Sequence, residues 1–327
     1  MDLVDRSEKF IGFYSADGFW VGEAIDYQDP DKSRKLTGII PEIAIEFRCE
    51  EFGIAVCVDG LMLLRVEHLA QAVPQVGDPQ QFAASLQWWD EHLDYANVLQ
   101  LALESESIKC NISSEVTGTA VAISDTCRVG FLDGIAVNWN HDNQRSLVAA
   151  RHEILVWLVN GQKGPPPHAV SSAWKPWAVV TSDAVRSAIG TFKLISYDKD
   201  LVKRLSFLAK AKASFAKNDY RVAFTLLWFV IESAAKALIT NGANVSIQRL
   251  SMKAVGDELR SKSLISDEIF ELLKVLRSDI RNRLVHEPGT TFCLPEHCLA
   301  AAKLAIDLAV RNPAIDLRLN WESGVQY

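Results

Sequence analysis

Residues 266–288 read SDEIFELLKVLRSDIRNRLVHEP, a stretch whose apolar side chains recur every three or four residues. This spacing places them on one face of an α-helix, and they are Ile269, Leu272, Leu273, Leu276, Ile280 and Leu284. Ser266 is suited to cap the N-terminus, because its hydroxyl can accept a bond from a free backbone N–H. Pro288 disfavours helical backbone at Glu287 and ends the helix there. The stretch therefore predicts a helix with one buried face, packed within a helical domain.

Three polar side chains near the end of this helix carry groups that are used in catalysis: a guanidinium in Arg281, an amide in Asn282 and an imidazole in His286. An imidazole can take a proton from a hydroxyl or give one to a leaving oxygen near neutral pH. A guanidinium can hold a phosphate and stabilise the charge that develops on it, and the amide can orient the phosphate or the imidazole. Arg277 lies one turn earlier, on the flank of the apolar face. These groups suit cleavage of a phosphodiester bond in RNA, a reaction that requires no metal.

The spacing of Arg281 and His286 limits how the two side chains can act together. They are five residues apart, which is about 140° around an ideal helix, so they would not point the same way in a straight helix. Either the last turn unwinds beside Pro288 and lets His286 swing, or two copies of the segment face each other in a dimer.

Residues 281–286, RNRLVH, resemble the Arg-x(4–6)-His motif of HEPN domains, in the form where a polar residue follows the arginine. The resemblance covers about residues 195–312. It includes a long early helix with an acidic residue among apolar ones, and the motif at the end of a later helix. Glu232, within residues 229–238, fits the acidic position. The N-terminal part of the chain is not covered.

The resemblance implies a metal-independent endoribonuclease without a cofactor, because many HEPN proteins are such enzymes and act as dimers in toxin–antitoxin and anti-phage defence systems. It implies catalytic roles for Arg281, Asn282 and His286 and supporting roles for Glu232 and Arg277. RNA and a second copy of the chain are the partners expected. Other HEPN proteins are not catalytic, so a dimerisation or RNA- or protein-binding module of a larger complex is the alternative.

Basic residues elsewhere in this part of the chain could follow an RNA backbone toward the motif. They are Arg283, Lys203, Arg204, Lys210 and Lys212. The ordinary solubility of a helix explains such residues equally well.

Further helices are expected around the motif helix, over residues 200–216, 218–240 and 246–262, followed by one that Pro295 opens and Asn312-Pro313 closes. Short connections between five helices predict a bundle.

The N-terminal part mixes strands and helices. Apolar and β-branched runs predict strands over residues 10–14, 18–22, 43–47, 53–58 and about 116–137, the last with a hairpin at Asp133-Gly134. Helical patterns cover residues 61–73, 79–103 and 147–159. The expected fold class is therefore α+β, a strand-rich mixed domain followed by an all-α, HEPN-like bundle. We expect three segments: a domain of unknown role over 1–160, a Pro-rich linker or docking segment over 161–195, and the bundle over 196–316.

Charge is divided unevenly along the chain. Residues 1–190 carry 14 Lys and Arg against 26 Asp and Glu, a net of −12, whereas residues 191–327 carry 20 against 15, a net of +5. The C-terminal part is thus the one suited to meet a polyanion, and the acidic N-terminal part could bind a protein partner or antitoxin. The start of the chain lacks a secretory pattern, and the most apolar run, residues 222–231, is shorter than the roughly 20 residues that span a bilayer. We therefore expect a cytoplasmic protein that does not enter a membrane.

Six cysteines are scattered along the chain without the pattern of a disulfide scaffold. Cys293, His297 and Cys298 lie within six residues, but a zinc site would need a fourth ligand. Buried thiols that pack as small apolar groups are the simpler interpretation, and no metal is expected.

Overall fold

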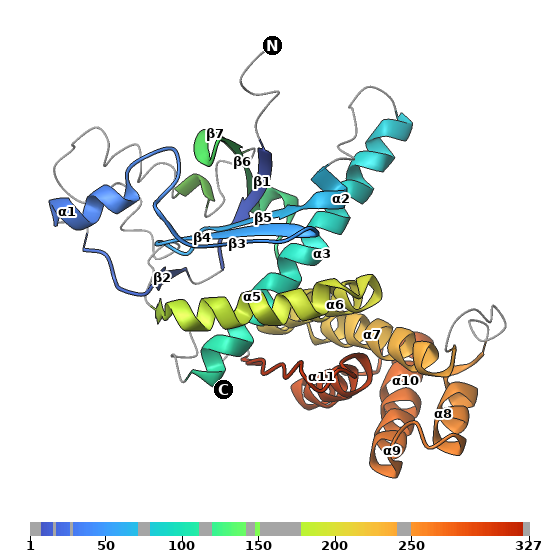
Figure 1. The fold of residues 1–327 in the computed structure, drawn as a ribbon. Coiled ribbons are helices and arrows are strands. Elements are labelled where there is room, and N and C mark those ends of the chain that lie inside the picture. Colours follow the sequence, from blue (N-terminus) through green and yellow to red (C-terminus); the bar gives the residue numbers. More distant parts are fainter. Residues whose placement is uncertain are drawn as a thin grey trace. The chain divides into compact units, whose positions relative to one another are not determined.

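The computed structural model describes residues 8–15, 18–26, 29–70, 79–110, 120–141, 148–150, 178–240 and 250–322. These residues form two compact units that divide between Lys193 and Leu194. The first unit combines a sheet with helices, and the second is helical in its described residues (Figure 1), so the expected α+β class is confirmed.

Six strands of the first unit form one antiparallel sheet in the order β3-β4-β5-β1-β6-β7. Their bounds are β1 Glu8–Phe13, β3 Ile43–Arg48, β4 Phe52–Cys57, β5 Met62–Val66, β6 Thr126–Leu132 and β7 Ile135–His141. Gly12, in the inner strand β1, pairs with Leu63 on one side and Cys127 on the other. A Cβ atom at Gly12 would lie 2.5 Å from the Cys127 sulfur, so the sheet needs glycine at this position.

One hairpin of this unit confirms the turn expected at Asp133-Gly134, and a second joins β3 to β4. Strands β6 and β7 are joined at Asp133 and Gly134, whose φ angles of 52° and 79° are those of the two-residue turns that match strand twist. Strands β3 and β4 are joined around Cys49, whose backbone N–H donates to the carbonyl of Phe52 at 3.0 Å.

The prediction of a helix over residues 61–73 is wrong for the first part of this range. Met62–Val66 is strand β5, and the helix α2 covers Glu67–Ala70. Strand β5 lies between β4 and β1, and most of its side chains are buried. A strand that is buried on both faces has a continuous apolar run, without the alternation that distinguishes a strand from a helix. The rest of the predicted helix lies outside the described residues.

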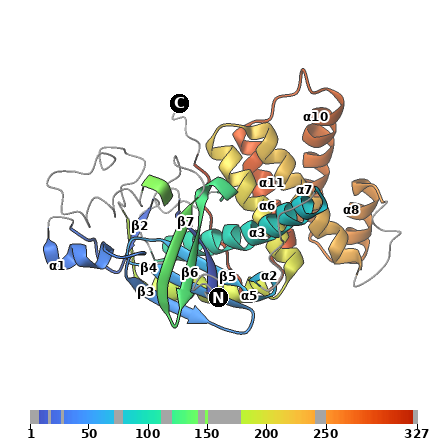
Figure 2. The same ribbon diagram turned by 90° about the horizontal axis from the view of Figure 1, so that it is seen from above.

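The long helix α3 (Pro79–Lys109) runs along the sheet (Figure 2). The Gln100 side chain donates to the backbone carbonyl of Tyr14 at 3.1 Å and so connects the helix to the end of β1. The helix continues past the expected end at Leu103. In the part that follows Leu93, nearly every side chain is buried, polar ones included, so its burial is not limited to one apolar face.

Helix α5 (Ser182–Ser196) completes this unit, because the ring of Phe192 packs edge-on against Phe52 of β4 with centroids 4.9 Å apart. Before it, strand β8 (Ala178–Val180) pairs in parallel with β2 (Phe19–Val21). The described end of the segment expected as a linker is therefore a strand and a helix. The short elements of the unit are α1 Pro30–Ser33, η2 Arg34–Leu36 and η3 Ile123–Asp125.

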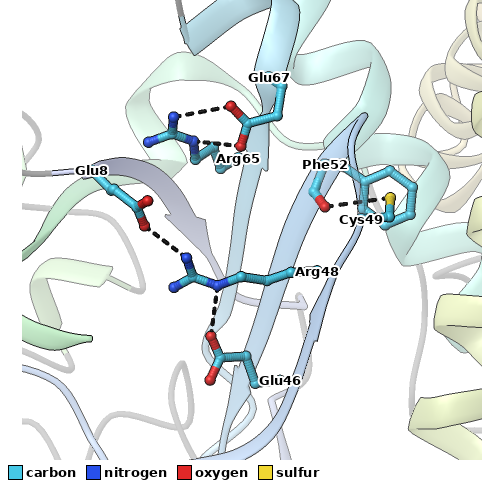
Figure 3. A network of polar contacts seen from close by, with 7 residues as sticks. All are labelled: Glu8, Glu46, Arg48, Cys49, Phe52, Arg65 and Glu67. Atoms are coloured by element: carbon cyan, nitrogen blue, oxygen red, sulfur yellow. Dashed lines mark hydrogen bonds and ion pairs between the residues drawn. The ribbon is translucent and has the colours of Figure 1, made fainter. Parts of the chain in front are cut away.

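One polar network on the sheet resembles a site but is internally satisfied (Figure 3). Arg48 donates to Glu46 at 2.8 Å and to Glu8 at 2.9 Å, and Arg65 donates to Glu67 at 2.7 Å. The hydrogen bonds to Glu46 and Glu67 raise the pKa of the two guanidinium groups above the ordinary value. Ion pairs of this kind contribute little to stability and leave no unpaired charge for a ligand.

The second unit begins with the end of α5 and continues as a set of helices. They are α6 Lys199–Ala216, α7 Tyr220–Thr240, α8 Met252–Ser261, α9 Asp267–Val275, the π-helical turn η6 Leu276–Arg281, α10 Asn282–His286 and α11 Pro295–Ala309. Helix α7 packs against both α6 and α11. Each helix expected in this part of the chain is present, and Pro295 opens the last one as predicted.

By length and composition alone, residues 220–239 of α7 could also cross a membrane. The apolar run therefore extends beyond the ten residues considered in the sequence. In the most apolar 18-residue window of this stretch, 44% of the residues are buried within the protein, which agrees with the packing of α7 against α6 and α11. A core helix of a soluble unit has the same composition, so the feature is weak evidence for a membrane span.

Some predictions lie wholly or partly outside the described residues. They concern the strand at residues 116–119, the helix over 147–159 apart from the helical residues 148–150, the linker at 161–168 and the start of the helix at 246–249.

A buried histidine on α3 makes the stability of the fold sensitive to acid. His92 is 4% exposed, its Nδ1 lies 3.0 Å from the carbonyl oxygen of Trp88, and the Trp88 ring covers it at 4.0 Å. Burial lowers the pKa of His92 from 6.5 to about 4, because the charged form loses its hydration.

The unfolded chain therefore binds a proton at His92 between pH 6.5 and pH 4 that the folded chain does not, and stability falls as the pH falls through this window. We expect His92→Gln to reduce the loss of unfolding free energy between pH 7 and pH 5 by about 2 kcal/mol. Urea denaturation of both proteins at the two pH values measures this difference. An equal loss in both proteins would contradict the prediction.

Candidate functional site

The motif lies on one continuous helical stretch made of α9, η6 and α10. Its start is capped as expected, because the Ser266 hydroxyl accepts from the backbone N–H of Ile269 at 3.3 Å. Its end is also as expected: Glu287 has φ −130° and ψ 52°, outside the helical region, directly before Pro288. The stretch thus carries Arg281 and His286 to the last turns of a helix that is anchored at both ends.

The turn η6 in the middle of this stretch was not predicted. The backbone N–H of Asn282 donates to the carbonyl of Arg277, five residues earlier rather than four, which is the bond of a π-helix. Turns of this kind often occur at functional sites. The apolar spacing of Leu273, Leu276 and Ile280 continues through the turn without a change, so the sequence carries no signal for it.

The predicted apolar face holds this turn in the protein. Leu273, Leu276 and Ile280 are buried, and η6 packs against α9 and α11. This packing fixes one side of the helix and leaves Arg277 and Arg281, which are partly buried, on its flank. The expected buried face is confirmed.

Arg281 and Asn282 are joined directly. The guanidinium Nη1 of Arg281 donates to Oδ1 of Asn282 at 3.2 Å. In the described part of the chain this is the one polar contact of Arg281, so the remaining N–H groups of its guanidinium can bind an anion. The amide therefore orients the cation in this structure.

His286 is the last residue of α10, and its side chain is exposed. Beside it, Arg283 and Glu287 form an exposed ion pair at 3.6 Å. Arg281, the last residue of η6, has helical backbone angles of φ −59° and ψ −50°, and residues 282–286 are α-helical, so the offset between Arg281 and His286 stays at about 140°. Within one chain the described contacts do not join these two side chains, and the last turn does not unwind before His286.

Glu232 is part of α7 and makes a different contact from the one that the resemblance implies. Its carboxylate accepts from Nζ of Lys236, one turn later in the same helix, at 2.6 Å. Among the described contacts none joins Glu232 to Arg281 or His286.

The basic residues of α6 differ in their surroundings. Lys203 is exposed, Arg204 donates to the Ser233 hydroxyl at 3.2 Å, and the Lys210 ammonium lies 5.4 Å from the centre of the Phe207 ring. Lys212 is 3% exposed and belongs to the interior of the unit. The prediction that Lys212 binds RNA at the surface is therefore contradicted by its burial.

A groove between α8 and α9 adds a feature that the sequence did not indicate. Its volume is about 290 Å³, and its charged lining consists of Lys253, Arg260, Lys274 and Arg277 together with the carboxylates of Asp257 and Glu271. Arg260 is occupied, because its guanidinium lies over the Phe270 ring at 4.6 Å and pairs with Asp267 at 2.8 Å. Lys274 pairs with Glu271 at 3.0 Å. The side chains of Lys253 and Arg277 make no hydrogen bond or ion pair with the described residues, so the groove presents two unpaired cations beside the carboxylate of Asp257.

Comparison of the chain with protein-family models, curated proteins and solved structures finds no match. The chemistry of the site is therefore argued from its own residues.

Packing of the π-helical turn leads to a prediction on stability. Replacing Ile280 with Ala removes buried apolar volume at the turn and should lower the free energy of unfolding by about 2–4 kcal/mol. Val285→Ala is the matched control, because Val285 lies on the same helical stretch but is exposed, and its loss should cost less than about 0.5 kcal/mol. Urea denaturation compares the two variants. Equal effects would show that η6 is not anchored through Ile280.

Proposed function

We propose that the second unit is a metal-independent RNA endonuclease of the HEPN type, with a site that two copies of the chain complete. The observation that carries the proposal is the end of the helix formed by residues 267–286. A guanidinium oriented by its neighbouring amide and an exposed imidazole lie there, within five residues of each other, on a helix packed into an all-α unit.

The residues act as follows in this proposal. His286 takes the proton of a ribose 2′-hydroxyl, which then attacks the adjacent phosphorus, or gives a proton to the leaving 5′-oxygen. Arg281 binds the phosphate and stabilises the negative charge that grows on its oxygens. Asn282 holds the guanidinium in position through the 3.2 Å hydrogen bond.

Two copies are part of the proposal because of the helix geometry. Arg281 ends the π-helical turn with helical backbone angles, and α10 is regular through His286, so the two side chains lie about 140° apart. In a two-fold dimer, Arg281 of one copy and His286 of the other can meet across the interface and form two equivalent sites.

The groove between α8 and α9 supports RNA as the substrate. Arg277 lines the groove and precedes Arg281 by four residues, about one helical turn, so the two cations follow one another along the helix. Lys253 adds a second unpaired cation. A phosphate bound in the groove would neutralise charges that the protein leaves unpaired, and the backbone of a single strand could continue from there to Arg281.

The first unit would sense a signal, restrain the ribonuclease or recruit a protein partner, in keeping with its net charge of −12 over residues 1–190. A cytoplasmic toxin or anti-phage role is the setting that the family analogy suggests.

The second candidate is a non-catalytic HEPN-like module that dimerises or docks a partner. It is favoured by large apolar side chains that remain exposed near the helix end and in the segment after it. Val285 is 56% exposed, Phe292 76% and Leu294 49%. Exposed apolar groups of this size are common at protein interfaces.

Cleavage of labelled single-stranded RNA in the presence of EDTA tests the first candidate. We expect the wild-type protein to cleave, and Arg281→Ala and His286→Ala to reduce the rate by about 10²–10⁴-fold, because each removes one part of the proton-transfer and phosphate-binding machinery. Lys262→Ala is the control, since it removes one exposed cation of the same unit and should leave the rate unchanged. Cleavage that persists in both site variants would reject the assignment.

Mixing the two inactive variants tests the composite site. Random dimerisation gives mixed dimers in half of the molecules, and each has one site with both Arg281 and His286, so about a quarter of the wild-type rate should return. A site built within one chain would give no recovery. Absence of cleavage by the wild-type protein together with a stable dimer would favour the non-catalytic module.

Binding measurements test the role of Arg277. Arg277→Gln should weaken binding of single-stranded RNA and lower the slope of log affinity against log salt concentration by about 0.7, the value for one phosphate contact on a single strand. Fluorescence anisotropy across a salt series measures both quantities, with Lys262→Gln as a control of equal charge change. An unchanged slope in Arg277→Gln would exclude a phosphate contact at the groove.

A further inference from the structure

Two thiols lie next to each other where the chain enters α11. Cys293 belongs to the segment before the helix, and Cys298 lies in the first turns of the helix, which Pro295 opens. Their Sγ atoms are 3.8 Å apart, and both residues are buried, Cys293 at 8% and Cys298 at 0% exposure. A disulfide has an S–S distance of about 2.05 Å, so the sulfurs would have to approach by roughly 1.8 Å.

The surroundings of Cys293 favour its thiolate. The thiol of Cys298 can donate a hydrogen bond to the Cys293 sulfur, and the positive charge of Arg221 acts on it as well. The hydrogen bond and the Arg221 charge lower the pKa of Cys293 in spite of its burial. Arg221 is held in place, because its Nη2 donates to the carbonyl of Thr291 at 2.7 Å.

Cys298 has the opposite environment. Its sulfur also lies 3.3 Å from the backbone carbonyl oxygen of Tyr220, which is an alternative acceptor for the single S–H proton. The neighbouring Cys293 and burial raise the pKa of Cys298 above its ordinary value. Cys293 is therefore suited to attack an oxidant as a thiolate, and Cys298 stays protonated beside it.

We infer that Cys293 and Cys298 form a peroxide-reactive pair that closes to an intramolecular disulfide. The Cys293 thiolate attacks one oxygen of a hydroperoxide, the O–O bond breaks, and Cys293 becomes a sulfenic acid while the other oxygen leaves as water or an alcohol after taking a proton. The Cys298 sulfur then attacks the Cys293 sulfur. The S–S bond forms, the S–O bond breaks, and the hydroxide leaves as water with the Cys298 proton. The two sulfurs lose two electrons in total, and the peroxide gains them.

A metal site is a weaker interpretation of the same residues. His297, between the two cysteines, uses its Nδ1 to accept from the backbone N–H of Leu294 at 3.1 Å, as part of the cap of α11. Within the described ranges no group of three or more His, Cys, Asp and Glu side chains is placed to hold a metal ion. The inference does not depend on the proposed ribonuclease, because it concerns the thiols alone.

Peptide mapping of the full-length protein tests the inference. Trypsin releases both cysteines in one peptide, residues 284–303, because no Lys or Arg lies between Arg283 and Lys303. The protein is treated with limiting hydrogen peroxide, and its remaining thiols are alkylated under denaturing conditions. After digestion with trypsin, mass spectrometry measures the peptide masses. We expect the mass of this peptide to be two hydrogen atoms below that of the reduced peptide, with no alkyl group attached. After reduction with dithiothreitol and a second alkylation, the peptide should carry two alkyl groups. Cys110 is the internal reference, because it is exposed and its thiol contacts no other thiol in the described part of the chain.

Two variants test the roles within the pair. In Cys298→Ala, the sulfenic acid of Cys293 should persist and react with dimedone, whereas Cys293→Ala should leave Cys298 unmodified. Arg221→Gln should shift the pH profile of Cys293 oxidation to higher pH, an effect that a purely structural role would not produce. Oxidation of Cys110 while the 284–303 peptide keeps both thiols would overturn the inference, and so would dimedone labelling of Cys298 in place of Cys293.

Discussion

The burial of one face of the helical stretch 267–286 is the constraint on which the second unit depends. Leu273, Leu276 and Ile280 occupy the interior, and Ser266 and Pro288 fix where the helix starts and ends. Because this face is buried in the core, Arg277 and Arg281 lie partly buried on the flank beside it. The end that carries His286 is in turn exposed. The packing of the apolar face thus determines that Arg277 and Arg281 are partly exposed and that His286 is on the surface.

The π-helical turn shifts the phase of that helix at Leu276–Arg281, directly before Asn282. The extra residue in the turn rotates α10, and with it His286, relative to α9. Arg281 ends the turn with helical backbone angles, so its offset from His286 stays at about 140°. The described contacts of one chain therefore do not bring the side chains of Arg281 and His286 together.

The segment that follows His286 connects the two chemical features of this unit. It leads from the end of α10 through Thr291, held by Arg221, to Cys293 and the cap of α11. A covalent bond between Cys293 and Cys298 would tie this segment to α11 a few residues from the motif. The first unit has no comparable feature in its described residues, since its most visible charges, such as Arg48 and Glu8, satisfy one another.

The sequence by itself determined the α+β class, the helices of the second unit, the cap at Ser266, the helix end at Glu287 and the Asp133-Gly134 hairpin. These features depend on local chemistry: periodic apolar residues, a capping hydroxyl, proline and a left-handed turn. Only the tertiary structure decided that Met62–Val66 is a strand, because burial on both faces removes the alternation that marks one. It also decided the π-turn, the burial of Lys212 and the approach of Cys293 to Cys298. Each of these depends on which elements pack together, and the spacing of residues along the chain does not encode that.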